Sequence, residues 1–518
     1  MFTSLAIRPH ARTRIFIAIL LAGSSIPALT YAQDQLTKSA SLVDMSESER
    51  STMAQKIMAI ANRVANESNY FDEEMRPVYL TGSFDVENNV FHFDMEERFG
   101  PEAGYHQLAD LHRAVEIAIE PLTNQVDKLY TIYWTYGGKD IEFWMPRPPQ
   151  KQGATNANPA SAFPTGRGVA PVVVAAGHGY YYHLKEKNWK PHREPSNGIL
   201  EDEVTPILAD ELVKALRSNN VLVEELRPIQ TGYLHEPSGR PWWHIGPRYR
   251  FEKTLPDHPE IWHSLPTSTD AARDRREDIK SRPLYANHVG SPAIIHVHTN
   301  AHDKDPTING ARVYVAERRP EDAKLAKLAL CSMSEAIHSV DRFKAFKVAA
   351  EPHSAKDDAE NNLASMPSII VETAFHTNVG DAELLKDPEF RKISMMGVAK
   401  GYRLYTEGKS CQKFAIEKIA AVDAFVGQQV NQSVKVSGHP VFPVDMIYKP
   451  SRCRREPCEA ERKLVFNQAG IDAFRVPYFC AADDVAKGPI DFSVWAKDAW
   501  GVKTDEVIFH LSCKARSR

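Results

Sequence analysis

Residues 169–179 read VAPVVVAAGHG: an almost continuous apolar run, rich in valine, ends in Gly177-His178-Gly179. A run of this kind is typical of a strand that is buried on both faces of a parallel sheet. Strand-like and helix-like stretches then alternate, which predicts an α/β fold with a mostly parallel sheet flanked by helices. The strand-like stretches are 221–226, 293–297, 311–315 and 368–371, and the helix-like stretches are 205–217, 321–340 and 390–407.

The regions on either side of this unit have different patterns. Residues 33–145 predict a small α+β module, and residues 146–168, rich in Pro, Gly, Asn and Ala, predict an exposed linker. The α/β unit then spans 169–412, and the short alternating runs of 413–518 predict an antiparallel β domain. Within the first module we expect a helix over 46–69 with a Ser46/Glu49 capping box, a strand at 90–93, a helix over 106–120 ended by Pro121, and a hairpin over 129–145.

The N-terminus has the pattern of a secretory signal peptide. Arg8, Arg12 and Arg14 precede an apolar run, and Thr30-Tyr31-Ala32 offers small residues for cleavage. The apolar run is too short and too broken by glycine, serine and proline to span a bilayer. Residues 1–32 are therefore expected to be removed, which predicts a periplasmic or extracellular protein without a stable membrane span.

The net charge and the cysteine content exclude some classes of protein. The chain has 518 residues, with 67 acidic and 63 basic side chains and a net charge of −4. This balance argues against a nucleic-acid-binding protein, which carries a basic excess. The six cysteines form no CxxC pair, and in an exported chain they predict disulfides. Plausible pairs are Cys453 with Cys458 and Cys480 with Cys513.

Two candidate site residues lie near the first strand. His178 follows that strand, and the glycine on each side permits a sharp turn that exposes the imidazole; an ordinary loop histidine is the alternative. Glu201, Asp202 and Glu203 precede a helix for which Thr205 is the expected cap and Pro206 the first-turn residue. Any of the three carboxylates could serve the helix dipole alone.

Further candidates follow the later strands. The strand 293–297 contains His296, and His298 directly follows it. Residues two apart on a strand share a face, so either imidazole or both could bind a metal. A buried core histidine is the alternative for His296. Glu372 directly follows the apolar Ile369-Ile370-Val371, where an ionised carboxylate needs a partner or a metal. Two histidines and a carboxylate suffice for a catalytic zinc with one open position.

Together these motifs resemble the zinc-dependent N-acetylmuramoyl-L-alanine amidases of the type 3 family. That family ends strands in Gly-His-Gly and Ser-Ile-His-x-Asn-Ala, opens a helix with Gly-x-x-Glu, and carries Arg-x-x-x-Ala-Asn and Pro-Ser-x-Leu-Val-Glu-x-Gly-Phe. The matching segments here are 177–179, 296–301, 198–201, 282–287 and 367–375. The resemblance covers about 169–405 and selects His298 over His296 and Glu201 over its acidic neighbours.

The resemblance implies an amidase-like catalytic domain and a secreted hydrolase. Zn²⁺ would be held by His178, Glu201 and His298, with Glu372 as the proton-transferring base. The implied substrate and partner is peptidoglycan, cut between N-acetylmuramic acid and L-alanine.

Departures from the family pattern leave alternatives open. Tyr180, Tyr181 and Tyr182 follow the first motif, and an insertion before Arg282 carries Trp242, Trp243, Tyr249 and Trp262. These aromatic residues could stack on sugar rings, cover the cleft or form a packed loop. The chain could therefore be a zinc hydrolase of another amide, or a non-catalytic wall-binding protein.

The acidic stretch 351–360, which ends in Glu360, is a further open point. It could cover the metal or be a solvated loop.

Overall fold

The computed structural model describes residues 41–67, 76–100, 105–126, 131–144, 170–230, 232–302, 305–354, 359–452, 462–467 and 474–516. The expected signal peptide, the expected linker 146–168 and the pairing of Cys453 with Cys458 lie outside these residues. Within them, no helix is both long and apolar enough to cross a membrane.

A six-stranded sheet in the order β12-β11-β13-β10-β4-β7 organises the middle of the chain. Its strands at the site are fully buried, as the apolar runs predict. The strands are β4 (Val172–Ala176), β7 (Val223–Glu225), β10 (Ile294–Asn300), β11 (Arg312–Val315), β12 (His353–Ser354) and β13 (Ser368–Phe375).

The sheet is mixed, which corrects the expectation of a mostly parallel arrangement at one position. Four strand pairs are parallel, but β11 runs antiparallel to β13. The physical reason is the connection: none of the described residues between the end of β10 at Asn300 and the start of β11 at Arg312 is helical. A parallel return needs a crossover of a dozen or more residues, usually helical.

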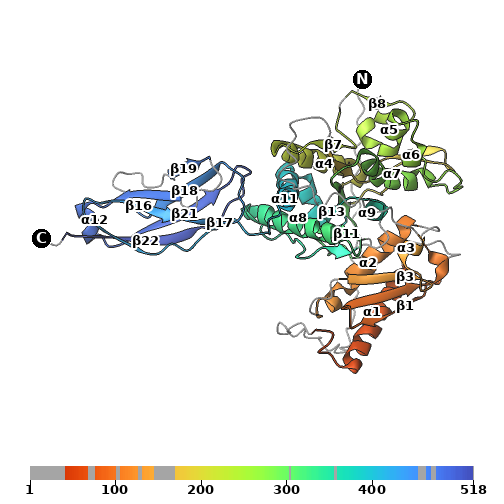
Figure 1. Ribbon diagram of the computed structural model, residues 1–518, viewed down its shortest axis with the longest axis horizontal. Helices are drawn as coiled ribbons and strands as arrows, with labels where there is room; N and C mark the ends of the chain where they lie inside the picture. Colours follow the sequence, from red (N-terminus) through yellow and green to blue (C-terminus); the bar gives the residue numbers. More distant parts are fainter. Residues whose placement is uncertain are drawn as a thin grey trace, which may run out of the picture. The chain divides into compact units, whose positions relative to one another are not determined.

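Helices cover both faces of this sheet (Figure 1). Val172, Val174 and Ala176 of β4 share a core with α4 (Glu201–Ser218), α8 (Pro320–His338) and α11 (Pro388–Thr406). Val173 and Ala175 point to the other face, where they pack with residues of α5 (Pro247–Thr254), α6 (Pro259–Trp262) and α7 (Arg273–Val289). The remaining elements are β5 (Tyr181–His183), β6 (Asn188–Lys190), β8 (Leu234–His235), β9 (Arg240–Pro241), η4 (Trp242–His244), η5 (Asp341–Phe343), α9 (Ala359–Asn362) and α10 (Val379–Lys386).

The helix α4 starts at Glu201, four residues before the expected cap at Thr205, so that prediction is wrong. Pro206 therefore lies inside the helix, where it has no N–H to donate to the carbonyl of Asp202. The guanidinium of Arg227 donates to that carbonyl instead, at 2.5 Å. The Thr205 hydroxyl donates to the carbonyl oxygens of Glu201, at 3.0 Å, and Gly177, at 2.7 Å.

The described residues between 41 and 144 contain three α-helices, one short 3-10 helix and a three-stranded sheet, with a core of their own. Ser46 and Glu49 form the predicted capping box, since each backbone N–H is bonded to the other's side chain. The second helix continues past Pro121. The expected turn at Gly137-Gly138 is present, closed by an antiparallel bridge between Tyr136 and Lys139, but the strand before it, β3, pairs in parallel with β2, and α3 follows in place of the second hairpin strand. The elements are α1 (Glu47–Glu67), β1 (Leu80–Asp85), β2 (Val90–Met95), η2 (Glu97–Phe99), α2 (Tyr105–Thr123), β3 (Thr131–Tyr136) and α3 (Ile141–Trp144).

From residue 414 onward the described chain is mainly strand. The largest sheet has the order β15-β22-β21-β18-β19 and is antiparallel except for β15 with β22. The disulfide Cys480–Cys513 is confirmed, and Cys331 pairs with Cys411. The elements are β14 (Ala415–Ile416), β15 (Val422–Phe425), β16 (Gln429–Val434), β17 (Val436–Ser437), β18 (Val444–Pro450), β19 (Arg462–Phe466), β20 (Phe474–Phe479), α12 (Ala482–Ala486), β21 (Ile490–Lys497) and β22 (Val507–Lys514).

Candidate metal centre

Three of the four predicted site residues meet at the carboxyl ends of β4 and β10. The ligand atoms of His178, Glu201 and His298 all lie within 4.8 Å of one another, and all three residues are buried. His178 Nε2 lies 3.2 Å from His298 Nδ1 and 3.3 Å from Glu201 Oε2, and His298 Nδ1 lies 3.4 Å from Glu201 Oε1. Among the described residues this is the one cluster of three or more such side chains with that spacing.

The Gly177-His178-Gly179 turn creates this proximity. His178 itself adopts the left-handed conformation, with φ of 57°, and Gly179 follows with φ of 123°. The imidazole of His298 lies directly against Gly177: a Cβ at that position would be 2.3 Å from its Cε1 and 2.4 Å from its Nδ1. Gly177 is therefore needed to leave room for the second imidazole, a role that the sequence did not reveal.

The three adjacent carboxylates in the first turn of α4 have different partners. Glu201 is buried, and its Oε1 accepts a hydrogen bond from the backbone N–H of Thr299 at 2.9 Å, which aims it at the end of β10. Asp202 accepts from the N–H groups of Gly179 and His192 and so supports the turn. Glu203 is partly exposed and pairs with His244 at 3.1 Å. Only Glu201 of the three belongs to the cluster.

Glu372 lies beside His298 on the neighbouring strand. In the parallel pairing of β10 and β13 the two residues are register partners, so their side chains project from the same face of the sheet. Glu372 is fully buried. His296 and His298 share this face with Ile294, which packs in the core on the α7 side. His298 and Glu372 thus project from one face of the sheet, on neighbouring strands.

The electrostatics of the cluster favour a cation. Burial lowers the pKa of His178 to about 3, more than the nearby Glu201 carboxylate raises it. Burial also acts to lower the pKa of His298, but the charges and hydrogen bonds of Glu360, Glu201 and Glu372 outweigh it and raise that pKa to about 10. Burial tends to raise the pKa of Glu201, yet the two imidazoles hold it well below its usual range. Buried carboxylates therefore dominate the electrostatics around His298.

Two groups adjoin the cluster that sequence reasoning did not single out as site residues. Arg193 Nε donates to His178 Nε2 at 3.4 Å and lies 3.6 Å from Glu201 Oε2. His192 Nδ1 lies 3.3 Å from His178 Nδ1. Both residues lie between β6 and the Gly198–Glu201 motif, where the sequence has no periodic or motif signal.

The aromatic insertion packs against the segment that follows His178. The N–H of Tyr180 donates to the carbonyl of His244 at 2.8 Å, and the N–H of Tyr182 donates to the Tyr249 hydroxyl at 2.7 Å. The Tyr249 hydroxyl in turn donates to Asp274 at 2.9 Å. The members of the aromatic cluster are Tyr180, Tyr181, Tyr182, Trp189, Trp242 and Tyr249. For this part of the insertion the packed-loop interpretation is the one that the contacts favour.

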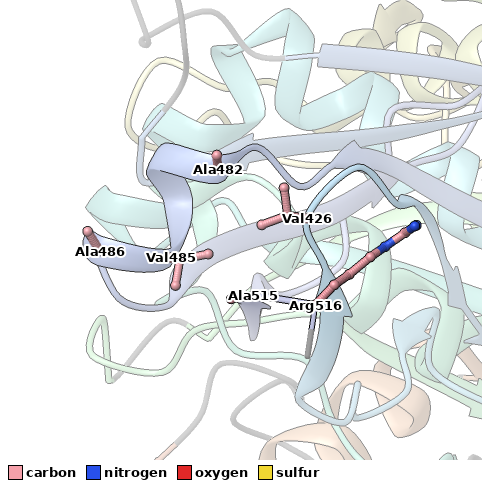
Figure 2. A pocket seen from close by; sticks show the side chains of 6 residues that line it. All are labelled: Val426, Ala482, Val485, Ala486, Ala515 and Arg516. Atoms are coloured by element: carbon pink, nitrogen blue, oxygen red, sulfur yellow. The ribbon is translucent and has the colours of Figure 1, made fainter. Parts of the chain in front are cut away.

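An apolar pocket is also present in the C-terminal part of the chain (Figure 2). Its lining contains no histidine, cysteine or carboxylate, so it offers neither acid–base nor metal chemistry. The lining residues are Val426, Ala482, Val485, Ala486, Ala515 and Arg516.

Comparison with known proteins identifies one matching family. Residues 263–403, which include His298 and Glu372, match the family model described as N-acetylmuramoyl-L-alanine amidase, Amidase_3. No protein of curated function matches the chain.

Several solved structures are distantly similar. N-acetylmuramoyl-L-alanine amidase AmiC2 of Nostoc punctiforme is 20% identical with a TM-score of 0.31, and the match covers 46% of this chain and 98% of that one. For the CwlD amidase from Clostridioides difficile, solved with the GerS lipoprotein, the values are 17% and 0.30, with 46% and 98% covered. For Ami1 from Mycobacterium smegmatis they are 16% and 0.31, again with 46% and 98% covered.

Proposed function

We propose that this chain is a zinc-dependent N-acetylmuramoyl-L-alanine amidase. It would hydrolyse the amide between the lactyl group of N-acetylmuramic acid and L-alanine in peptidoglycan. The observation that carries the proposal is the buried cluster of His178, Glu201 and His298. The match of residues 263–403 to the amidase family supports the choice of substrate.

The donor set fits zinc in kind and in spacing. Two imidazoles and one carboxylate are the ligands of catalytic zinc sites that keep a fourth position open. In a tetrahedral site with bonds of about 2.0–2.1 Å, neighbouring ligand atoms are about 3.3 Å apart. The two imidazole nitrogens here are 3.2 Å apart, and Glu201 reaches them with different oxygens, Oε2 at 3.3 Å from His178 Nε2 and Oε1 at 3.4 Å from His298 Nδ1; with one atom taken from each residue, all three lie within 4.8 Å of one another. His178, Glu201 and His298 would hold the ion, with zinc taking the place of the Arg193 N–H at His178 Nε2.

Glu372 is the proposed proton carrier. Bound zinc supplies a Lewis acid that polarises the scissile carbonyl and acidifies water. The Glu372 carboxylate accepts a proton from the attacking water as the new C–O bond forms. It then donates that proton to the amine nitrogen of L-alanine as the C–N bond breaks. Its place beside His298 in the strand register keeps the carboxylate next to one of the proposed ligands.

A variant of Glu372 tests this assignment. Glu372→Gln is expected to retain zinc and to lose about 10²- to 10⁴-fold in the rate of sacculus lysis, the usual contribution of a general acid–base group. Zinc content by elemental analysis and the turbidity of purified sacculi are the two measurements. Glu383→Gln, an exposed substitution on α10, is the matched control. Full lytic activity in Glu372→Gln would contradict the proposed role of Glu372.

The aromatic cluster next to His178 supports one alternative, namely hydrolysis of another amide by the same site. Tyr180, Tyr181 and Tyr182 pack where the amidase motif has small residues. Product analysis separates the two substrates, because each releases a different amine and a different carboxylate. Sacculus binding by a protein that holds no zinc would instead support a non-catalytic role.

We further propose that residues 169–412 form the catalytic domain of an exported protein. Two disulfides in the described residues fit an oxidising compartment such as the periplasm or the cell exterior. Peptidoglycan is the proposed partner, and cleavage after residue 32 is the proposed processing step. N-terminal sequencing of the protein recovered from the periplasm or culture medium checks both the compartment and the cleavage point.

A further inference from the structure

Glu360 contacts the candidate metal ligand His298 from the side opposite the cluster. Its Oε2 lies 3.0 Å from His298 Nε2, whereas His298 Nδ1 faces His178 and Glu201. Glu360 belongs to the short helix α9 and is only 3% exposed. The two nitrogens of one imidazole are thus divided between the cluster and this buried carboxylate.

A histidine can bind a metal only through a ring nitrogen that carries no proton, and the other nitrogen then carries the N–H. A carboxylate facing one nitrogen selects the tautomer in which that nitrogen is protonated. We propose that Glu360 is a positioning residue, which holds the N–H of His298 on Nε2 and so presents Nδ1 to zinc. This inference rests on the proposed zinc site and adds to it a residue outside the ligand set.

Glu360 is itself held in place, as such a role requires. Its Oε1 forms an ion pair with Arg282 NH1 and lies 3.3 Å from His296 Nδ1. Arg282 also pairs with Asp278 at 2.7 Å and donates to the carbonyl oxygen of His178 at 3.0 Å. One guanidinium therefore connects the backbone of the first imidazole ligand to the carboxylate that faces the second.

The helix that carries Glu360 is also anchored to the sheet. Asn361 Nδ2 donates to the carbonyl of Tyr314 at 3.2 Å, and the Ser368 hydroxyl donates to Asn361 Oδ1 at 2.8 Å. Tyr314 and Ser368 lie on β11 and β13. A positioning group has to be more rigid than the group it orients, and these bonds fix α9 to strands of the same sheet.

Zinc affinity measured without substrate tests the proposal. The metal-free full-length protein is titrated with zinc against a chromophoric chelator, for the wild type, Glu360→Gln and Glu360→Asp. Glu360→Gln is expected to bind zinc about 10- to 100-fold more weakly, the usual effect of removing such a partner. Glu360→Asp keeps the charge beside Arg282 but shortens the reach, so it should fold and still lose affinity.

A matched control separates this role from a general loss of stability. Glu277 is another fully buried glutamate that pairs with a histidine and an arginine, at 2.9 Å from His263 Nδ1 and 3.1 Å from Arg248 NH2. Within the described residues, Glu277 forms no ion pair or hydrogen bond with His178, Glu201 or His298. Glu277→Gln should therefore leave zinc affinity unchanged. Nitrogen-15 chemical shifts of the histidine rings add a direct readout, because zinc-loaded wild type should show His298 protonated at Nε2.

The possible outcomes are distinct. Weaker zinc binding in both Glu360 variants, with normal affinity in Glu277→Gln and an Nε2-protonated His298, supports the proposal. Wild-type affinity in Glu360→Gln overturns it, as does an equal loss in Glu277→Gln. Unchanged zinc affinity with faster lysis would show that Glu360 covers the site instead. If the wild type binds no zinc, the proposed function itself fails, which is a separate result.

Discussion

Replacing Gly177 by alanine tests the geometry of the cluster without substituting any of the proposed ligands. The added Cβ would lie 2.3 Å from Cε1, 2.4 Å from Nδ1 and 2.6 Å from Nε2 of His298. The backbone of Gly177 cannot easily yield, because its N–H donates to Val297 and its carbonyl accepts from both Thr205 and Arg227. The strain therefore falls on the imidazole of His298.

The expected displacement follows from these distances. Ordinary contacts of a Cβ atom begin at 3.4 Å, so a ring atom at 2.3–2.4 Å must retreat by about 1 Å. Metal sites tolerate errors of only about 0.2 Å in ligand distance, and a shift of about 1 Å in a reacting group costs about 10²-fold in rate. We therefore expect Gly177→Ala to bind zinc at least about 100-fold more weakly and to lose lytic activity in proportion.

Competition with a chelator gives the zinc affinity, and circular dichroism shows whether the variant folds. Gly380→Ala is a suitable control, because its Cβ would meet a single atom, the side-chain oxygen of Asn378, at 3.3 Å. Wild-type zinc affinity in a folded Gly177→Ala variant would show that His298 does not bind the metal in this orientation, and the proposed ligand set would be wrong.

Three further predictions test other parts of the structure. Glu201→Gln should abolish measurable zinc binding, whereas Glu203→Gln, two residues further along α4 and partly exposed, should leave it unchanged in the same chelator assay. Burial and the nearby Asp210 charge raise the pKa of Glu225 from 4.5 to about 7. As pH rises, the carboxyl of Glu225 ionises in the unfolded state before it ionises in the folded state. The free energy of unfolding therefore falls between pH 4.5 and pH 7, by at most about 3 kcal/mol, and stays lowered above pH 7. Glu225→Gln should therefore raise the unfolding temperature at pH 8 and give no gain at pH 4.5; equal shifts at both pH values would contradict this. Removing the Cys480–Cys513 disulfide, which has a sequence separation of 33, should cost about 4 kcal/mol in chemical unfolding of the C-terminal part. An unchanged unfolding midpoint would refute that estimate.

The strands that carry the site were predictable because a fully buried strand has an almost continuously apolar sequence. Val172–Ala176 and Ser368–Phe375 are buried along their whole length, so an apolar run could indicate them without any knowledge of neighbours. The end of the first strand then located His178, whereas β13 continues past the predicted end at Val371 to Phe375, so Glu372 lies inside this strand. The direction of β11 was not predictable in this way, since an apolar strand has the same composition in either direction.

The contacts around the ligands depend on parts of the chain that are distant in sequence. Glu360 meets His298, and Arg227 replaces the helix hydrogen bond that Pro206 cannot make. Neither pairing has a local signal, because each depends on how two separate elements pack. For the same reason the start of α4 was misplaced: a proline usually marks the first turn, and the compensating arginine follows the helix.

Mass spectrometry of purified sacculi digested by the zinc-loaded protein tests the proposed function most directly. We expect peptides with a free N-terminal L-alanine and glycan strands whose N-acetylmuramic acid carries a free lactyl carboxylate. Both products should be absent when zinc is removed and return when zinc is restored. Cleavage at another bond, or the same products from a protein without zinc, would contradict it.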